Sequence, residues 1–288
     1  MLKRIAALGA ALAIAVTGAL VGATPALASG GPFYHAGFAQ DLSAAKAATA
    51  TAVSGNMTVY SIATTAGVHA IGEVSVQTDN GATPTASSTR DGVVEVGYTQ
   101  FGGGGLTVFV SQWVNSVWGG SYTGTGDGFV KCSKVVPYNC SGVPANLNPG
   151  DALTSGATYV FSVTYTGGAW WLAFQPNTGC PAGKTCFLGY YPGTLWSGAS
   201  PAVSFTRPDF IQAFGEVYNT AAPASVCTNM GDGNFPTTTV GGFIGSVTYT
   251  GLPTSDVQLT MNRDTDPTMY SSLSLSGRTF RYGGPGAC

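Results

Sequence analysis

The chain has 288 residues, a length that suits one large domain or two small ones. Charged residues make up only 8% of it, with 11 basic and 13 acidic side chains and a formal net charge of −2. This composition excludes a nucleic-acid partner, because such binding depends on clustered basic residues.

The first 28 residues are predicted to be an export signal. Lys3 and Arg4 precede an apolar run from Ile5 to about Val21, and Ala26-Leu27-Ala28 has the small-x-small pattern that signal peptidase cleaves. A membrane anchor is the alternative, since the apolar run approaches the length that spans a bilayer. The Ala/Gly-rich run and the cleavage pattern favour a signal. We therefore predict a secreted, extracellular protein with no membrane segment after cleavage at Ala28.

The chain holds six cysteines, an even number that fits a disulfide set in an oxidising compartment. Six cysteines allow 15 pairings. Sequence neighbours suggest three of them: Cys132–Cys140, Cys180–Cys186 and Cys227–Cys288. Zinc is the alternative, but spacings of eight and six residues with almost no histidine do not suit a tetrahedral site. We predict three disulfides and no metal or other cofactor.

Short runs rich in Val, Thr, Tyr, Phe and Trp follow the signal and alternate with turn-forming residues, as in all-β proteins. One alanine-rich stretch, Leu42–Ala52, is predicted as either a short helix or an irregular lead-in. The predicted strands are, in chain order, Met57–Thr64, Ala70–Gln77, Val93–Gln100, Leu106–Val114, Thr158–Thr166, Ala169–Gln175, Phe187–Tyr191, Ala202–Phe205, Phe210–Asn219, Phe243–Thr250, Val257–Asn262 and Thr279–Tyr282.

The number and regular spacing of these short strands predict an all-β fold, either a β-sandwich or a jelly roll. Thr166-Gly167-Gly168-Ala169 is a strong hairpin signal, because two glycines accept the positive φ that tight hairpins need. No repeat or linker divides the chain, so we predict one domain over residues 29–288. Its oligomeric state is expected to be monomeric.

Reactive side chains are scarce in this sequence, and this limits the catalytic mechanisms that the chain could support. The two histidines, His35 and His69, form no metal-binding pattern. A serine triad needs a histidine base, which His35 could supply, but no G-x-S-x-G turn is present. Paired cysteines would leave no nucleophilic thiol. Most aspartates stand in turn sequences, so the carboxylates that remain as candidates are glutamates.

The three glutamates, Glu73, Glu95 and Glu216, all fall within apolar, strand-like runs where glutamate is disfavoured. A carboxylate among Val and Phe must be hydrogen-bonded or protonated, since its desolvation is costly. A glutamate that simply faces solvent from a sheet is the alternative for any one of them. Two such residues flanked by Gly and Tyr favour a two-carboxylate site at Glu95 and Glu216, and Glu73 stays open as a further candidate.

The two glutamates lie in the motifs Val94-Glu95-Val96-Gly97-Tyr98 and Gly215-Glu216-Val217-Tyr218-Asn219. In these motifs and in their order, the chain resembles the neprosin family of glutamic endopeptidases. Further segments also match: Asp127–Cys140, the Trp-Trp strand Gly168–Phe174, the turn Leu188–Pro192 and the stretch Thr228–Pro236. The resemblance covers roughly Phe33 to Thr250, and the short alanine-rich signal suggests a bacterial member.

The resemblance implies an antiparallel, two-sheet, jelly-roll-like β-sandwich whose cleft holds catalytic Glu95 and Glu216. It also implies hydrolysis of peptide bonds after proline at acidic pH. Tyr98 stands where the family pattern suggests tryptophan. The expected partner is a proline-containing peptide or protein. Nine residues are predicted to contact this substrate or its oxyanion: Tyr98, Gln112, Trp113, Trp170, Trp171, Tyr190, Gln212, Tyr218 and Asn219. For the aromatic residues among them, packing in the core is the alternative.

The predicted mechanism is direct attack by water. One glutamate, ionised, takes a proton from the water, while the other, protonated, polarises the scissile carbonyl and protonates the leaving nitrogen. Two nearby carboxyls should share a proton in mild acid. A jelly-roll glycoside hydrolase would also use paired carboxylates. Besides the peptidase and the glycoside hydrolase, the sequence is also compatible with a non-catalytic, carbohydrate-binding β-sandwich.

Overall fold

The computed structural model describes residues 33–79, 91–132, 148–175 and 186–287. Two antiparallel sheets make up this part of the chain. The seven-stranded sheet has the order β13 (Met261–Asn262), β1 (Phe33–Asp41), β11 (Phe210–Tyr218), β3 (His69–Thr78), β4 (Gly92–Phe101), β5 (Leu106–Val114) and β6 (Val117–Trp118).

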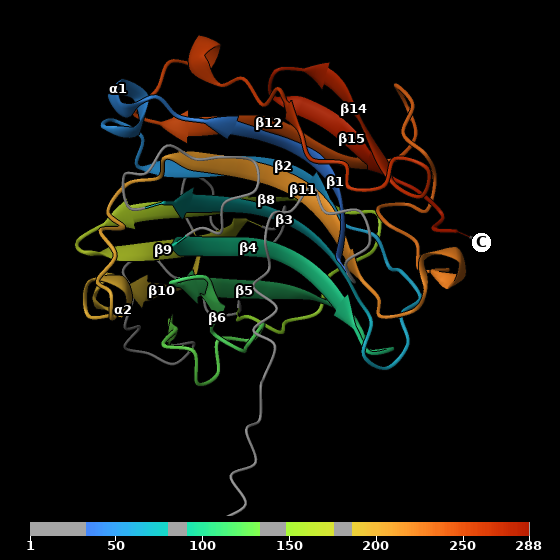
Figure 1. Cartoon of the computed structure of the whole chain (residues 1–288), viewed down its shortest axis with the longest axis horizontal. Helices are drawn as coiled ribbons and strands as arrows, with labels where there is room; N and C mark the ends of the chain where they lie inside the picture. Colours follow the sequence, from blue (N-terminus) through green and yellow to red (C-terminus); the bar gives the residue numbers. More distant parts are fainter. Residues whose placement is uncertain (1–32, 80–90, 133–147, 176–185, 288) are drawn as a thin grey trace, which may run out of the picture.

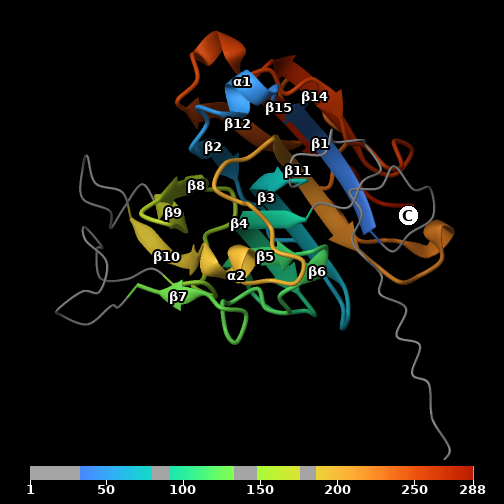
Figure 2. The same cartoon turned by 60° about the vertical axis from the view of Figure 1, so that its left-hand side comes forward.

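The eight-stranded sheet has the order β14 (Ser271–Ser276), β15 (Thr279–Gly283), β12 (Gly242–Thr250), β2 (Ala52–Thr58), β8 (Thr158–Thr166), β9 (Ala169–Gln175), β10 (Phe187–Pro192) and β7 (Val130–Lys131). The described helices are one turn or less, namely α1 (Ala44–Ala47), α2 (Thr194–Ser197), η1 (Pro223–Ser225) and η2 (Thr254–Asp256). Figure 1 shows the curved strands of both sheets, and the turned view of Figure 2 shows β8, β9 and β10 to one side of β1 and β11. The predicted antiparallel β-sandwich is confirmed.

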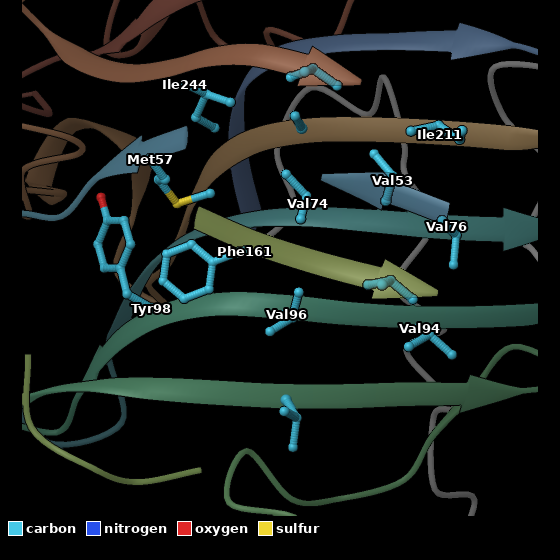
Figure 3. Close-up of a cluster of buried hydrophobic side chains, with 14 of the residues drawn as sticks. Val53, Met57, Val74, Val76, Val94, Val96, Tyr98, Phe161, Ile211 and Ile244 are labelled. Carbon is cyan, nitrogen blue, oxygen red and sulfur yellow. The ribbon is translucent and has the colours of Figure 1, made fainter. Parts of the chain in front are cut away.

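The core lies between the two sheets and follows the two-residue alternation of the strands. In β3 and β4, Val74, Val76, Val94 and Val96 are fully buried, and they face residues such as Phe161 of the second sheet (Figure 3). One face of the seven-stranded sheet is thereby committed to the core. The alternate residues of β3 and β4 point the other way, and the functional candidates lie among them.

Several predicted strands match the structure closely, and the predicted hairpin is present. β5, β8 and β9 have the predicted bounds. Gly167 and Gly168 join β8 to β9 with φ values of 58° and 79°, a backbone conformation that favours glycine. Turn chemistry and β-branched residues therefore predict this part of the fold well.

Three other predicted strands were wrong in whole or in part. Ala202–Phe205 forms no strand, because Val203 and Phe205 are buried as part of an irregular segment that packs on Trp170 and Trp196. Of the predicted strand Val257–Asn262, only Met261–Asn262 is a strand. The predicted strand Met57–Thr64 is replaced by β2, which ends at Thr58.

Four strands of the structure have no counterpart in the prediction, namely β1, β6, β7 and β14. Within the alanine-rich stretch 42–52, only α1 is helical. β1 is buried along most of its length, so it lacks the alternation of a half-exposed strand. β14 consists mainly of serine, which carries little strand signal.

The predicted export signal lies outside the described residues. Cys132, Cys186 and Cys227 each form a disulfide, but Cys140, Cys180 and Cys288 also lie outside the described residues, so the pairing stays a prediction. Among the residues that the structure describes, no helix combines the length and apolar character needed to cross a membrane.

Candidate active site

The three glutamates of the chain lie on one face of the seven-stranded sheet. Residues paired across neighbouring strands share a face, and so do residues two apart in one strand. Glu95 of β4 pairs with Ser75 of β3, and Glu216 of β11 pairs with Ile71 of β3. Ile71, Glu73 and Ser75 follow one another on one face of β3. We call this surface, which points away from the core valines, the glutamate face.

Glu73 stands midway between the other two glutamates. β3 runs between the strands that carry Glu95 and Glu216, and Glu73 is one two-residue step from the partner of each. Diagonal neighbours of this kind are about 7–8 Å apart in an antiparallel sheet. The three side chains therefore form a diagonal row across β11, β3 and β4.

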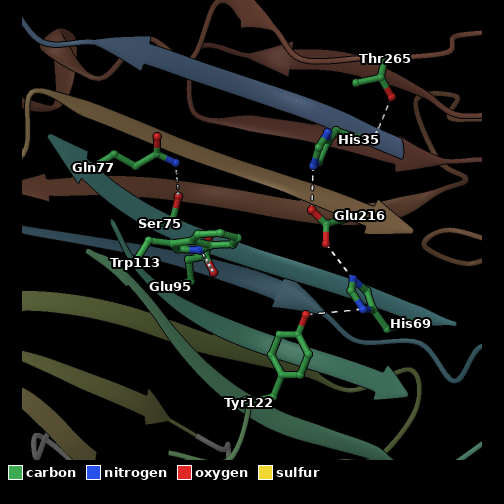
Figure 4. A network of polar contacts seen from close by, with 9 residues as sticks. All are labelled: His35, His69, Ser75, Gln77, Glu95, Trp113, Tyr122, Glu216 and Thr265. Atoms are coloured by element: carbon green, nitrogen blue, oxygen red, sulfur yellow. Dashed lines mark hydrogen bonds and ion pairs between the residues drawn. The ribbon is translucent and has the colours of Figure 1, made fainter. Parts of the chain in front are cut away.

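Glu216 is held by both histidines of the chain. The Nε2 atom of His35 donates to Oε2 of Glu216 at 2.7 Å, and Nε2 of His69 donates to Oε1 at 2.8 Å (Figure 4). His35 is directly opposite Glu216 in the register of β1 and β11, while His69 comes from the neighbouring β3. Each carboxylate oxygen thus accepts one imidazole N–H.

These contacts decide the protonation state of Glu216. Burial alone would raise the pKa of this carboxyl, but hydrogen bonds from His35 and His69 and their positive charge lower it to about 2. Glu216 is therefore a carboxylate throughout mild acid. Among the described residues, no three His, Cys, Asp or Glu side chains are grouped so that they could hold a metal ion.

Glu95 has a different environment. Burial and the nearby charge of Glu216 raise its pKa to about 7, although hydrogen bonds from Ser111 and Trp113 act in the opposite direction. Nε1 of Trp113 lies 3.4 Å from Oε2 of Glu95 (Figure 4). Ser111 of β5 is the direct cross-strand partner of Glu95. No cation contacts it among the described residues. Glu95 therefore carries a proton in mild acid.

Aromatic rings connect the two ends of the row. Tyr218 stacks on His69 at 5.3 Å between ring centroids, and Tyr122 packs against the edge of the same imidazole at 5.6 Å. Trp118 lies 5.0 Å from Tyr122 and 6.5 Å from Trp113. A continuous series of ring contacts therefore extends from His69, beside Glu216, to Trp113, beside Glu95.

A comparison with models of protein families gives a match to this chain. The neprosin family model matches residues 76–285, most of the chain, and both motif glutamates lie within the match. The chain belongs to the neprosin family. Membership indicates a glutamic peptidase, the class that the two glutamate motifs predict.

A comparison with solved structures gives matches of low sequence identity to this neprosin-family chain. SCP-B, a member of the eqolisin family of peptidases in a complex with the tripeptide Ala-Ile-His, is 12% identical with a TM-score of 0.41, over 88% of this chain and 98% of that one. An alginate lyase from Klebsiella pneumoniae is 13% identical with a TM-score of 0.23, over 60% of each chain. No curated protein matches.

Three of the nine predicted substrate contacts lie on the glutamate face of this neprosin-family chain. Trp113 adjoins Glu95, and Tyr218 stacks on His69. Gln212 pairs with Ser75, the residue whose other partner is Glu95. These three side chains remain candidates for contact with a substrate.

Three others are corrected because they point into the sandwich. Tyr98 is fully buried on the opposite face of β4, where its hydroxyl is 2.8 Å from that of Tyr282. Trp170 is fully buried and donates to the carbonyl of Phe205. Gln112 faces the core side of β5 and donates to the carbonyl of Asp127. For these three residues, the alternation of side chains along the strand places the side chain inside the sandwich, away from the glutamate face.

The remaining three also lie away from the glutamates. Trp171 and Tyr190 pack on each other, with ring centroids 4.6 Å apart, on the outer face of the eight-stranded sheet. The whole sandwich therefore separates them from the glutamate face. Asn219 follows β11, accepts from the backbone N–H of Ala221 and donates to Thr228. Its side chain stabilises a turn.

Sequence reasoning missed the roles of His35 and His69. Along the chain the two histidines form no metal-binding pattern, and only His35 is a candidate there, as the base of a serine triad. The signal for His69 was its parity, which places it on the same face of β3 as Glu73. His35 could be assigned only with β1, whose pairing with β11 brings it opposite Glu216.

Proposed function

We propose that this protein is an endopeptidase that hydrolyses peptide bonds after proline in acid, with Glu216 as general base and Glu95 as general acid. The observation that carries the proposal is the contrast between the two glutamates. They share one sheet face, yet Glu216 is held as a carboxylate by two histidines and Glu95 is kept protonated by burial and by the charge of Glu216.

The reaction needs both protonation states at once. Glu216 takes a proton from a water molecule, whose oxygen attacks the scissile carbonyl carbon. Protonated Glu95 donates a hydrogen bond to the carbonyl oxygen and then transfers its proton to the leaving nitrogen as the C–N bond breaks. Glu216 then loses its proton to solvent and Glu95 takes one up, as their opposite pKa shifts favour.

The same contrast supports activity in acid. Above about pH 7 Glu95 loses its proton and the acid is gone. Below about pH 2 Glu216 gains a proton and the base is gone. A carboxylate with a pKa this low is a weak base, but it is one that remains ionised in strong acid. The working range is therefore expected between these limits.

The preference for proline rests on the family motifs around Glu95 and Glu216. Trp113 and Tyr218 are the predicted substrate contacts that lie on the glutamate face, and aromatic rings of this kind suit an apolar ring of a substrate. Secretion rests on the predicted signal of residues 1–28 and fits the disulfide-bonded cysteines.

The test uses the purified chain, a proline-containing peptide and xylan at acidic pH. Peptide cleavage after proline supports the proposal. Hydrolysis of xylan alone would indicate a glycoside hydrolase, and no hydrolysis of either would indicate a binding module. Glu95→Gln and Glu216→Gln should each lower peptide cleavage by roughly 10²–10⁴-fold and leave the fold intact. Trp171→Phe, on the outer face of the other sheet, is the control and should cleave as the wild type does.

A further inference from the structure

Glu73 occupies the centre of the proposed site but has no part in the two-glutamate mechanism. Its direct partners are Phe214 on β11 and Gly97 on β4, and its diagonal neighbours on those strands include Glu216 and Glu95. A group that bridges the gap between base and acid must lie in this position. Glu73 is the only residue of its strand whose register places it between them.

Glu73 is also buried, and one of its carboxyl oxygens has no hydrogen-bond partner among the described residues. The residue is 3% exposed, and the oxygen concerned is Oε1. An orphaned buried polar atom destabilises the folded state, so a sheet that gained nothing from this carboxyl would be more stable with an apolar residue. The atom is therefore available to a ligand within the site.

The backbone is adapted to this side chain. A Cβ at position 97 would lie 2.0 Å from the carbonyl oxygen of Gly72 and 2.8 Å from Cα of Glu73, so only glycine fits there. β3 and β4 thus approach closely beside Glu73.

The groups around Glu73 favour its neutral form. Burial and the charges of Glu95 and Glu216 raise its pKa well above the usual value. The other titratable groups on this part of the face are His35, His69, Tyr122 and Tyr218, and both imidazole Nε2 atoms are engaged by Glu216. Glu73 is thus left without a cation of its own among the described residues.

We propose that Glu73 is a third catalytic carboxyl, which stays protonated and donates a hydrogen bond to the reacting oxygen between Glu216 and Glu95. The donated bond would stabilise the negative charge that develops on this oxygen, as other preorganised donors do. Glu73 keeps its proton throughout, so no bond to it is made or broken. The inference rests on the proposed peptidase function.

Three variants test the inference by kinetics and thermal unfolding. Glu73→Leu removes the donor and should lower kcat by roughly 10²–10³-fold with little change in KM. Its Tm should rise, because an unsatisfied buried carboxyl is replaced by an apolar side chain. Glu73→Gln keeps a weaker donor and should lower kcat by about three- to tenfold. Thr99→Val is the control, since it also removes an orphaned buried polar atom from this face, and its kcat should stay unchanged.

The outcomes separate this inference from the proposed function. If the wild type cleaves peptides and Glu73→Leu cleaves equally well, Glu73 is not catalytic, whereas the function stands. Unchanged kcat in Glu73→Gln contradicts the inference in the same way, even if Glu73→Leu does not fold. If the wild type cleaves no peptide while its fold is intact, the proposed function fails and this inference fails with it.

Discussion

The surroundings of Glu216 and of Glu95 differ more than their sequence motifs do. Both residues stand in apolar strands, next to glycine or valine, on the same sheet face. Glu216 receives an imidazole N–H on each oxygen. Glu95 has a long contact with the indole of Trp113 and a hydrogen bond with Ser111.

This difference teaches that neighbours from other strands assign the protonation states of identical residues. The pKa of Glu216 is lowered to about 2 and that of Glu95 is raised to about 7. The two histidines lower the pKa of Glu216. Desolvation and the nearby charge of Glu216 raise the pKa of Glu95. A base and an acid thus arise from one residue type.

Removing the charge of Glu216 should have the largest effect. Glu216→Gln has nearly the same shape but cannot take a proton, so kcat/KM should fall by roughly 10²–10⁴-fold, the usual contribution of a general base. Peptide cleavage at pH 4 measures the loss, and circular dichroism confirms the fold. Retention of near wild-type turnover would mean that the base lies elsewhere.

The stability of the fold should depend on the proton of Glu95. Its folded pKa is raised to about 7, so its contribution is fully present below the unfolded value near 4.5 and is lost as pH rises through 7. A rise of this size corresponds to about 3 kcal/mol, or a roughly hundredfold change in the unfolding equilibrium. Urea unfolding at pH 4.5 and 7.5 measures the loss. Glu95→Gln should lose less stability over the same interval, and an equal loss in both proteins would contradict the assignment.

The histidine contacts should decide how far activity extends into acid. His69→Phe keeps the ring against Tyr218 but removes the N–H that Glu216 accepts, so the pKa of Glu216 should rise. A rise of about two units would reduce kcat/KM at pH 3 about tenfold and leave it nearly unchanged at pH 5.5. His69→Gln, which can still donate, is the matched control. Parallel losses at both pH values would indicate a merely structural role.

The smallest effect is expected at Trp113. Trp113→Phe removes the indole N–H that lies 3.4 Å from Glu95, and this contact lowers the pKa of Glu95. The alkaline limit of activity should therefore move upward by a few tenths of a pH unit, because an exposed or long hydrogen bond contributes about 1 kcal/mol or less. A downward shift in the kcat profile would contradict this account of Glu95.

The sequence predicts the sandwich well because β-branched residues, aromatic residues and glycine turns mark most strands. It also singles out Glu95 and Glu216, since glutamate is out of place in apolar strands. Alternation could have excluded Tyr98, whose parity is opposite to that of Glu95. The positions of Trp171 and Tyr190 could not be predicted, because strand patterns do not reveal which sheet a strand joins.

The histidine pair shows most clearly what the sequence alone lacks. His35 and Glu216 are 181 residues apart and meet only through the register of β1 and β11. β1 is buried along most of its length and therefore shows no alternation that would reveal it. The protonation states of the glutamates depend on such long-range pairings, so they required the structure.

The central claim is that one sheet face holds an ionised and a protonated glutamate together in mild acid. The chain has three glutamates, so a protein labelled with ¹³C at the glutamate carboxyl gives three NMR signals, which Glu→Gln variants assign. We expect the Glu216 signal to titrate near pH 2 and the Glu95 signal near pH 7. If both signals titrate together between pH 4 and 5, the account is contradicted.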